Sequence, residues 1–216
     1  MADTAHVFDA YGTLFDVHAA VRRHAAAVGP AAERLSLLWR DKQLEYSWVH
    51  ALMEDYVPFW ELTRRALDFA LRELDVDPVH AAPLLDAYRT LDAYPEVAAH
   101  LTALKGAGTT TAILSNGSPD MLAAAVASAG LETYLDHVLS VDAVRAFKTD
   151  RRTYALVTDA LDLSPSGVTF HSSNRWDVAG AARFGFRTVW VNRAGRTDEY
   201  PGHPPDRTVR SLAELG

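Results

Sequence analysis

Cysteine is absent from this 216-residue chain. Without a thiol, the chain can have no disulfide framework, no thiolate metal site and no cysteine nucleophile. It also has no continuous apolar run near the ~20 residues that cross a bilayer, so we expect no contact with membranes. Its first residues lack the basic stretch and apolar core of a secretory signal. We therefore expect a soluble cytoplasmic protein whose chemistry uses oxygen and nitrogen groups.

Basic charge is in short supply, because 21 lysines and arginines face 28 aspartates and glutamates, for a formal net charge of −7. A protein that binds nucleic acid needs a basic surface for the phosphates, so this balance argues against that class. The nine histidines show no His-x-x-x-His spacing, which argues against a zinc site. The composition, 49% hydrophobic and 23% charged, is that of a globular protein long enough to bury a core.

Short apolar runs that end on small polar residues predict the strands of a sheet. They cover residues 5–8, 110–114, 138–141, 168–170 and 188–191. Helical patterns separate the later runs, over residues 120–129, 152–161 and 176–184. Strands that alternate with helices predict βαβ units and therefore an α/β fold with a parallel sheet flanked by helices. Ligands bind such sheets beyond the carboxyl ends of the strands, where each polar cluster lies.

Residues 17–93 have almost no strand pattern and are expected to be helical. Breaks in the helical pattern fall at Gly29-Pro30, near Pro58 and at Pro78. We interpret this segment as a helical cap domain inserted after the first strand, with residues 1–16 and 94–216 forming the core domain. Residues 195–205, rich in glycine and proline, are expected to form an exposed loop before a short terminal helix at residues 211–215.

Three charged residues stand out as candidates for chemistry. Asp9 follows the first predicted strand and could act as a nucleophile; a turn or helix-cap aspartate is the alternative. Lys148 could lie across the crevice from Asp9 and attract an anion, or it could be a solvated surface lysine. Arg40 lies on an apolar helix and could point into the protein, unless it pairs on the surface with Asp41 or Glu45.

Two strand-to-helix turns add polar groups. Ser115 and Asn116 precede a helix start whose free N–H groups could bind an anion, while Ser118 is expected to cap that helix. The turn at residues 171–177 brings two hydroxyls, an amide and a carboxylate together. His171 within it is expected to point away from the site.

In order along the chain, these residues resemble the four motifs of the haloacid dehalogenase superfamily. The matching stretches are Asp9 in Phe-Asp-Ala-Tyr-Gly-Thr-Leu-Phe-Asp-Val, Ser115-Asn116, Lys148 and residues 172–177. Within that superfamily the chain is similar to the L-2-haloacid dehalogenases, through residues 39–48, 114–122 and 190–193. The resemblance covers nearly the whole chain. It implies a Rossmann-like core with a helical cap, a homodimer, and neither a metal nor another cofactor.

The resemblance also implies roles for the matching residues. Asp9 would be the nucleophile, Lys148 the partner that keeps it ionised, and Asp177 the base that activates water. The residues that would position Asp9 and the hydrolytic water are Thr13, Ser172 and Asn174. The departing halide would be held by Arg40, Asn116 and Trp176. The substrate carboxylate would be bound by Ser115 and the N–H groups of Ala10 and Tyr11, and Tyr154 is placed with these substrate-binding residues.

The reaction implied by the resemblance is hydrolytic dehalogenation of (S)-2-haloacids to (R)-2-hydroxyacids and halide, through an ester on Asp9 and with inversion. A phosphatase of the same superfamily is one alternative, but phosphatases use a second aspartate two residues after the first. Here that position is Tyr11, a poor proton donor at its usual pKa of ~10. In phosphatases, the turn that binds magnesium carries an aspartate at the position where this chain has Ser173. A halide needs no proton to leave.

A non-catalytic protein that binds small anions is the second alternative. The presence of Asp9 together with Lys148 and Arg40 argues against it, because a binding protein has no need of a carboxylate that faces an anion. Two positions depart from the family pattern. Thr149 stands where proline usually follows the lysine, and Arg175 adds a cation that we expect to be exposed.

Overall fold

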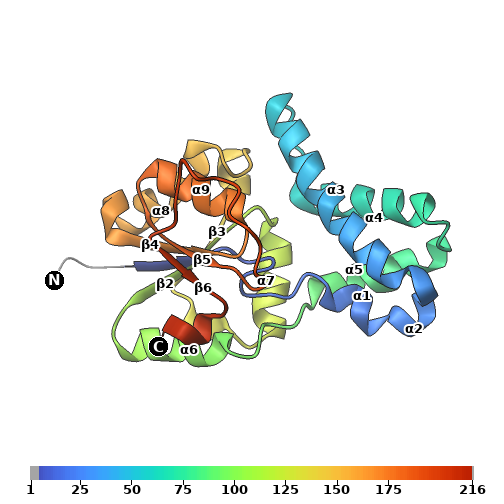
Figure 1. The fold of residues 1–216 in the computed structure, drawn as a ribbon, viewed down its shortest axis with the longest axis horizontal. Helices are drawn as coiled ribbons and strands as arrows, with labels where there is room; N and C mark the ends of the chain where they lie inside the picture. Colours follow the sequence, from blue (N-terminus) through green and yellow to red (C-terminus); the bar gives the residue numbers. More distant parts are fainter. Residues whose placement is uncertain (1–4, 216) are drawn as a thin grey trace.

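The computed structural model describes residues 5–215, and within them six parallel strands form one sheet (Figure 1). The strands are β1 (Ala5–Phe8), β2 (Thr110–Ser115), β3 (His137–Ser140), β4 (Val168–Ser172), β5 (Arg187–Val191) and β6 (Arg207–Val209). Their order across the sheet is β3-β2-β1-β4-β5-β6. The predicted α/β fold with a parallel sheet is confirmed.

Strand β1 lies in the middle of the sheet because its apolar residues can be covered on both faces. It pairs with β2 and β4, and Phe8 stands opposite Ile113 on one side and His171 on the other. Near-continuous apolar sequence is typical of parallel strands that helices bury from both sides. Since all the strands run the same way, the residues that follow β1, β2 and β4 meet at one edge of the sheet.

Helices cover both faces of this sheet. They are α6 (Val97–Gly106), α7 (Pro119–Ser128), α8 (Arg151–Leu161) and α9 (Arg175–Phe184), with a last 3₁₀ turn, η6 (Leu212–Leu215). Figure 1 shows α8 and α9 on one side and α6 with η6 on the other. Neither α6 nor β6 was expected from the sequence; β6 has only three residues, too few for a periodic pattern. No helix within residues 5–215 has both the length and the apolar character needed to cross a membrane.

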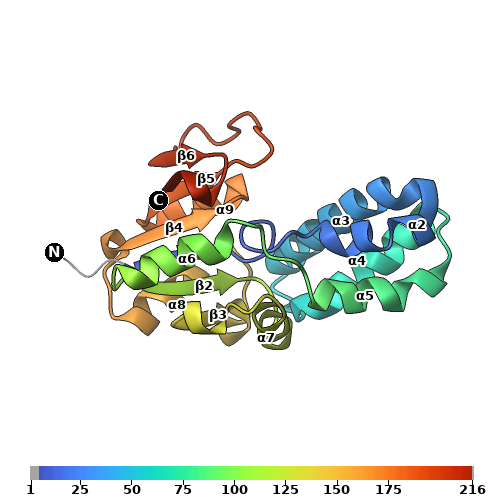
Figure 2. The same cartoon turned by 90° about the horizontal axis from the view of Figure 1, so that it is seen from below.

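Residues 19–89 form a separate group of helices beside the sheet (Figure 2), here called the cap helices. They are α1 (Ala19–Arg23), α2 (Ala25–Val28), α3 (Ala32–Leu52), α4 (Phe59–Glu73) and α5 (Ala81–Arg89), with 3₁₀ turns η1 (Gly29–Ala31) and η2 (Pro78–His80). The two connections to the sheet run side by side, since Asp16 N–H donates to Asp92 O at 2.9 Å and Tyr94 N–H to Leu14 O at 2.9 Å. The exact domain boundaries stay a prediction.

A buried polar network fixes α3 against its neighbours. Trp39 Nε1 donates to Thr63 O at 2.9 Å, and Gln43 Nε2 donates to Thr63 Oγ1 at 3.0 Å. Tyr88 on α5 donates to Gln43 Oε1 at 3.2 Å. Buried polar groups that are fully paired specify one arrangement, because any other leaves them without partners. This network therefore sets the rotation of α3 and points Arg40 toward the sheet.

Candidate active site

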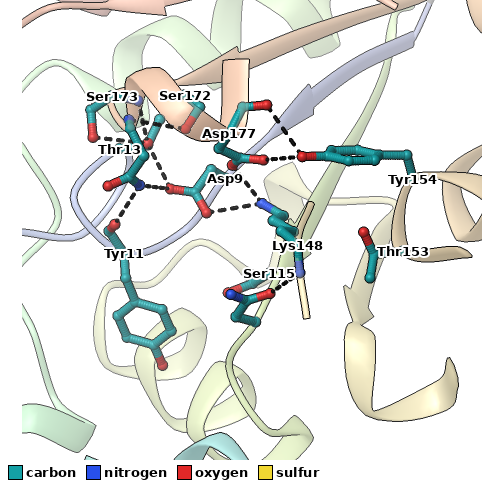
Figure 3. Close-up of polar contacts among 12 residues, drawn as sticks. Asp9, Tyr11, Thr13, Ser115, Lys148, Thr153, Tyr154, Ser172, Ser173 and Asp177 are labelled. Atoms are coloured by element: carbon teal, nitrogen blue, oxygen red, sulfur yellow. Dashed lines mark hydrogen bonds and ion pairs between the residues drawn. The ribbon is translucent and has the colours of Figure 1, made fainter. Parts of the chain in front are cut away.

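Asp9, directly after β1, is the centre of the polar cluster at the sheet edge (Figure 3). It is 5% exposed, and its carboxylate accepts hydrogen bonds from three side chains. Lys148 Nζ lies 3.1 Å from Oδ1, while Thr13 Oγ1 and Asn174 Nδ2 lie 2.9 and 2.8 Å from Oδ2. Charge-assisted bonds of this kind fix a carboxylate in one orientation. Asp9 is therefore held by side chains from three separate segments and does not serve as a helix cap.

Lys148 is buried, with 1% of its surface exposed, so it is not a surface lysine. Its ammonium bridges two carboxylates, Asp9 at 3.1 Å and Asp177 at 2.8 Å. Burial alone would lower the pKa of Lys148, but the charges of Asp177 and Asp9 outweigh it and the pKa is raised. Asn116 Oδ1 accepts the Lys148 N–H at 3.0 Å, and the Lys148–Thr149 peptide bond is cis. The ammonium therefore remains charged between its two partners.

Asp177 is the second carboxylate of the cluster and is fully buried. Tyr154 donates a hydrogen bond to Asp177 Oδ1 at 2.9 Å (Figure 3). Burial raises the pKa of Asp177 to about 6, although Lys148 acts in the opposite direction. A carboxyl group with a pKa near neutrality can accept or release a proton under ordinary conditions. Tyr154 lies behind Asp177 and is not on the wall of the catalytic pocket described below.

The turn after β4 holds Thr13 and Asn174 in place. Ser173 N–H donates to Thr13 Oγ1 at 2.8 Å, which leaves the threonine proton for Asp9. Ser172 Oγ accepts the Asn174 N–H at 3.1 Å, so Ser172 orients Asn174 and makes no hydrogen bond to Asp9. From the sequence, Ser173 stood out only as a lost metal ligand, because its main-chain contact to Thr13 forms only when β1 and β4 are adjacent.

Asp9 faces a small cavity of about 10 Å³, here called the catalytic pocket. Its lining residues are Asp9, Tyr11, Arg40, Leu44, Phe59, Ser115, Asn116, Asn174 and Trp176. Six of the expected site residues besides Asp9 thus meet at one cavity: Tyr11, Arg40, Ser115, Asn116, Asn174 and Trp176. The apolar wall formed by Leu44 and Phe59 was missed. In the sequence, only the spacing of Leu44, four residues after Arg40 on the same helix face, pointed to this wall.

Arg40 reaches the catalytic pocket from the cap helices. Its Nη2 donates to Tyr11 O at 3.2 Å and to Asn174 Oδ1 at 3.4 Å. Lys42, not Arg40, takes Glu45 as its ion-pair partner, at 2.6 Å. The alternative of a surface pair for Arg40 is therefore wrong, because α3 turns this side chain toward the sheet.

Donors for an anion gather at the end of β1 and β2. The N–H groups of Ala10 and Tyr11 donate no hydrogen bond within residues 5–215. Ser115 lines the pocket, and its Oγ accepts the Gly117 N–H at 3.1 Å. The expected capping by Ser118 is wrong: its hydroxyl accepts the Trp60 N–H of the cap helices at 3.2 Å and makes no capping bond to α7.

Tyr11 occupies the position of a phosphatase's acid. Its ring stacks on Tyr88, with centroids 5.7 Å apart, and its buried hydroxyl has no hydrogen-bond partner among the described residues. Burial raises the pKa of the Tyr11 hydroxyl well above its usual value. It is therefore a still weaker proton donor than a tyrosine in water. Within residues 5–215, no group of three or more histidine, aspartate or glutamate side chains could hold a metal ion.

Arg175 and His171, both from the turn at residues 171–177, lie outside the pocket. Arg175 is 4% exposed, so the expectation of an exposed cation is wrong. Its Nε donates to Asp198 at 2.7 Å, and its Nη2 to the carbonyls of Tyr200 and His203 at 2.8 and 2.9 Å, because the loop before β6 folds over α9. His171 contacts His6 and stacks on Phe8 rather than reaching the pocket, in line with the sequence analysis.

Known proteins share this fold. The haloacid dehalogenase-like hydrolase family matches residues 4–185. The chain therefore belongs to the haloacid dehalogenase-like hydrolases.

Within this family, the chain is similar to proteins that act on haloacids. (S)-2-haloacid dehalogenase 4A of Burkholderia cepacia is 49% identical over 98% of this chain and 92% of its own length. (S)-2-haloacid dehalogenase 1 of Pseudomonas sp. (strain CBS-3) is 50% identical over 98% and 94%. The structure of L-2-haloacid dehalogenase from Xanthobacter autotrophicus with chloropropionic acid covalently bound has a TM-score of 0.89 at 40% identity, covering 99% of this chain and 96% of that one.

Proposed function

We propose that the protein hydrolyses (S)-2-haloacids to (R)-2-hydroxyacids and halide through an ester on Asp9. The observation that carries this proposal is the setting of the Asp9 carboxylate. It is bound by Lys148, Thr13 and Asn174 and faces a small pocket in which Arg40 is the cation from the opposite wall. The names of the curated relatives support the same substrate class.

In the first step, an Asp9 carboxylate oxygen attacks the carbon that carries the halogen. A C–O bond forms as the carbon–halogen bond breaks, the halide leaves with the bonding electron pair, and the carbon is inverted. The Arg40 guanidinium, the Asn116 amide and Trp176 line the pocket and stabilise the departing anion. Donors that are already in place act without reorganisation as the charge develops.

In the second step, water attacks the carboxyl carbon of the Asp9 ester. Asp177 takes the proton from this water and passes it on to the alkoxide that leaves as the 2-hydroxyacid. The raised pKa of Asp177, about 6, suits a group that exchanges a proton near neutral pH. Asp9 is regenerated with one oxygen from water. Tyr154 positions Asp177 through the 2.9 Å hydrogen bond.

Binding must overcome the repulsion between an anionic substrate and Asp9. Ser115 and the free N–H groups of Ala10 and Tyr11 bind the substrate carboxylate, while Lys148 offsets the charge of Asp9. Leu44 and Phe59 contact the alkyl chain. The charge near Asp9 is therefore set by a few buried groups and not by the net charge of the chain.

The site fits the two alternative functions, a phosphatase and a protein that only binds anions, less well. A phosphatase needs an acid for its leaving oxygen, and the buried Tyr11 hydroxyl, with its raised pKa, fits that role poorly. A halide leaving group requires no acid at all. A protein that only binds anions has no use for Asp9 facing the ligand, since the carboxylate weakens binding.

We further propose that residues 17–93 act as a cap domain over the core and that the protein forms a homodimer. Apolar side chains exposed at the end of α3 and directly after it support a dimer, notably Val49 (44%), Leu52 (86%) and Met53 (56%). Light scattering of the wild type and of Leu52→Asp tests this: a dimer that becomes a monomer supports it, and a monomeric wild type contradicts it. A cytoplasmic location stays a prediction.

The experiment for the reaction is a single turnover in oxygen-18 water with (S)-2-chloropropionate and no added metal. We expect halide from this enantiomer only, label in Asp9 by peptide mass analysis, and an unlabelled hydroxyl in the first product. Label that appears directly in the product would exclude the ester. Magnesium-dependent release of phosphate from an ester, without halide release, would favour the phosphatase.

A further inference from the structure

A second cavity lies next to the catalytic pocket, between the end of α3 and the helix α9. Its volume is about 400 Å³, and we call it the outer chamber. Residues that line it include Trp48, Arg151, Trp176, Arg183, Phe184 and Tyr200. Trp176 lines both this chamber and the catalytic pocket, so the indole is the shared wall of the two cavities.

The catalytic pocket is too small for a substrate as it stands. A volume of about 10 Å³ is close to the ~10–15 Å³ that a single water molecule requires. A haloacid has several times the size of water. The substrate can therefore reach Asp9 only if part of the pocket wall moves.

One side of α3 connects the two cavities. Arg40, Leu44 and Trp48 are four residues apart and so lie on the same face of the helix. The first two line the catalytic pocket and the third lines the outer chamber. The Trp48 ring meets Trp176 edge to face, with centroids 5.6 Å apart. At this point Trp48 of the cap helices contacts Trp176 of the core, and these two rings can part without breaking a hydrogen bond to each other.

The outer chamber has the chemistry of a site for small organic anions. Arg151 and Arg183 line it, and no aspartate or glutamate does so among the described residues. The Arg151 guanidinium lies over the Phe184 ring, 5.1 Å from its centroid. Two cations beside aromatic faces suit a carboxylate that carries a short apolar chain. This local charge is opposite to the net charge of −7.

We propose that the outer chamber is the access site for the haloacid, which it binds by the carboxylate before the substrate passes the Trp48–Trp176 pair to Asp9. The proposal rests on the proposed function, since it assigns the route of that substrate. It assigns Arg151 and Arg183 to capture and Trp48 to selection by size. None of these three side chains contacts Asp9 or takes part in the chemical steps.

The first test removes the two cations with Arg151→Gln/Arg183→Gln. For (S)-2-chloropropionate at low ionic strength we expect kcat/KM to fall about five-fold, with kcat unchanged, because encounter with the anion is weakened. The difference from wild type should vanish at about 0.5 M salt, where charges are screened beyond about 5 Å. The matched control is Arg64→Gln/Arg72→Gln, which removes two exposed arginines from α4.

The outcomes separate the access site from the reaction. A loss of kcat/KM in the first double variant and not in the control supports the outer chamber. Equal values in the two double variants, with halide released by the wild type, overturn the chamber and leave the proposed function intact. A wild type that releases no halide from any 2-haloacid overturns both.

The second test widens the passage with Trp48→Ala and uses Trp48→Phe as the conservative variant. We expect the ratio of kcat/KM for 2-bromohexanoate to that for bromoacetate to rise about five-fold in the alanine variant and less in the phenylalanine variant. Trp60→Ala, which removes a tryptophan of the cap helices that lines neither cavity, is the control. An unchanged ratio in Trp48→Ala, or an equal rise in Trp60→Ala, would contradict a role for Trp48 in selection.

Discussion

The two walls of the catalytic pocket are built in different ways. The core wall is a network in which Asp9 and Lys148 make hydrogen bonds of 2.8 to 3.1 Å and are both almost fully buried. The cap wall supplies Arg40, whose contacts to the core are 3.2 and 3.4 Å, together with the apolar Leu44 and Phe59. One wall is a charged network of short hydrogen bonds, while the other is mainly apolar, with one cation at longer contact distances.

This difference separates two tasks. Groups that form and break bonds must be held within a fraction of an ångström, and parallel strand ends provide such positions. The wall that admits substrates must move, and a wall of apolar side chains with long polar contacts moves more easily than a network of short hydrogen bonds. Substitutions in the core wall should therefore affect the chemical steps and stability together, and those in the cap wall should affect activity alone.

The largest effect is expected from Asp9→Asn in the core wall. The amide keeps the shape of the side chain but cannot form the ester, so halide release should fall by about 10⁴-fold. Ion chromatography of the halide released from (S)-2-chloropropionate measures this rate. Activity above one hundredth of the wild type, in a preparation whose mass confirms that the introduced amide is intact, would contradict the role of this carboxylate.

Lys148→Met tests whether the core wall couples chemistry to stability. Removing the cation leaves two buried carboxylates together, which should cost about 3 kcal/mol of unfolding free energy and about 10³-fold in turnover. Urea denaturation and halide release measure the two effects. Lys148→Met/Asp177→Asn, which also removes the fully buried carboxylate, should regain stability without regaining turnover. A stable Lys148→Met would show that the ammonium bridge does not hold the core wall.

Arg40→Gln makes the corresponding change in the cap wall. The loss of the cation beside the departing halide should lower kcat by about 10²-fold, while the unfolding free energy stays within about 1 kcal/mol because Arg40 is half-buried and its contacts are long. Arg34→Gln, an exposed position on the same helix, is the control. A loss of stability like that of Lys148→Met would remove the distinction between the walls.

Tyr154→Phe gives the smallest expected effect, seen in the pH profile. Asp177 must be ionised to accept a proton, so the rate of ester hydrolysis should fall as the pH falls through about 6. The Tyr154 hydrogen bond lowers the pKa of Asp177, so its loss should move this acid limb to higher pH and leave the rate at pH 9 within about three-fold. Single-turnover hydrolysis from pH 5 to 9 measures the shift, with Tyr134→Phe as control. A limb that does not move would exclude Asp177 as the base.

Much of the core wall could be predicted from the sequence. Asp9, Ser115 and Asn174 each follow an apolar run, and the parallel alternation of strands and helices requires such positions to converge. The sequence left undecided whether Lys148 and Arg40 are buried or exposed. A lone cation on a helix or loop has no spacing that distinguishes a surface position from a buried one. Their burial depends on which segments pack above them.

The errors have a common physical origin. Ser118 has the residue type and position of a helix cap, yet its hydroxyl binds Trp60, a residue 58 positions earlier in the chain. Arg175 has the residue type of the surface, yet a loop more than twenty residues later closes over it. Local preference is worth about 1 kcal/mol at such sites, so a tertiary partner can override it.

The sequence alone determined the parallel sheet, the helical segment at residues 17–93 and the order of the motif residues, because periodicity and local turn chemistry specify these features. Only the tertiary structure decided that Asp177 is buried with a raised pKa, that Leu44 and Phe59 complete the catalytic pocket, and that Trp48 meets Trp176 beside an outer chamber. Burial, electrostatic shifts and cavity walls arise from contacts between distant segments. Such contacts are set by the packing of the whole chain and leave no local pattern.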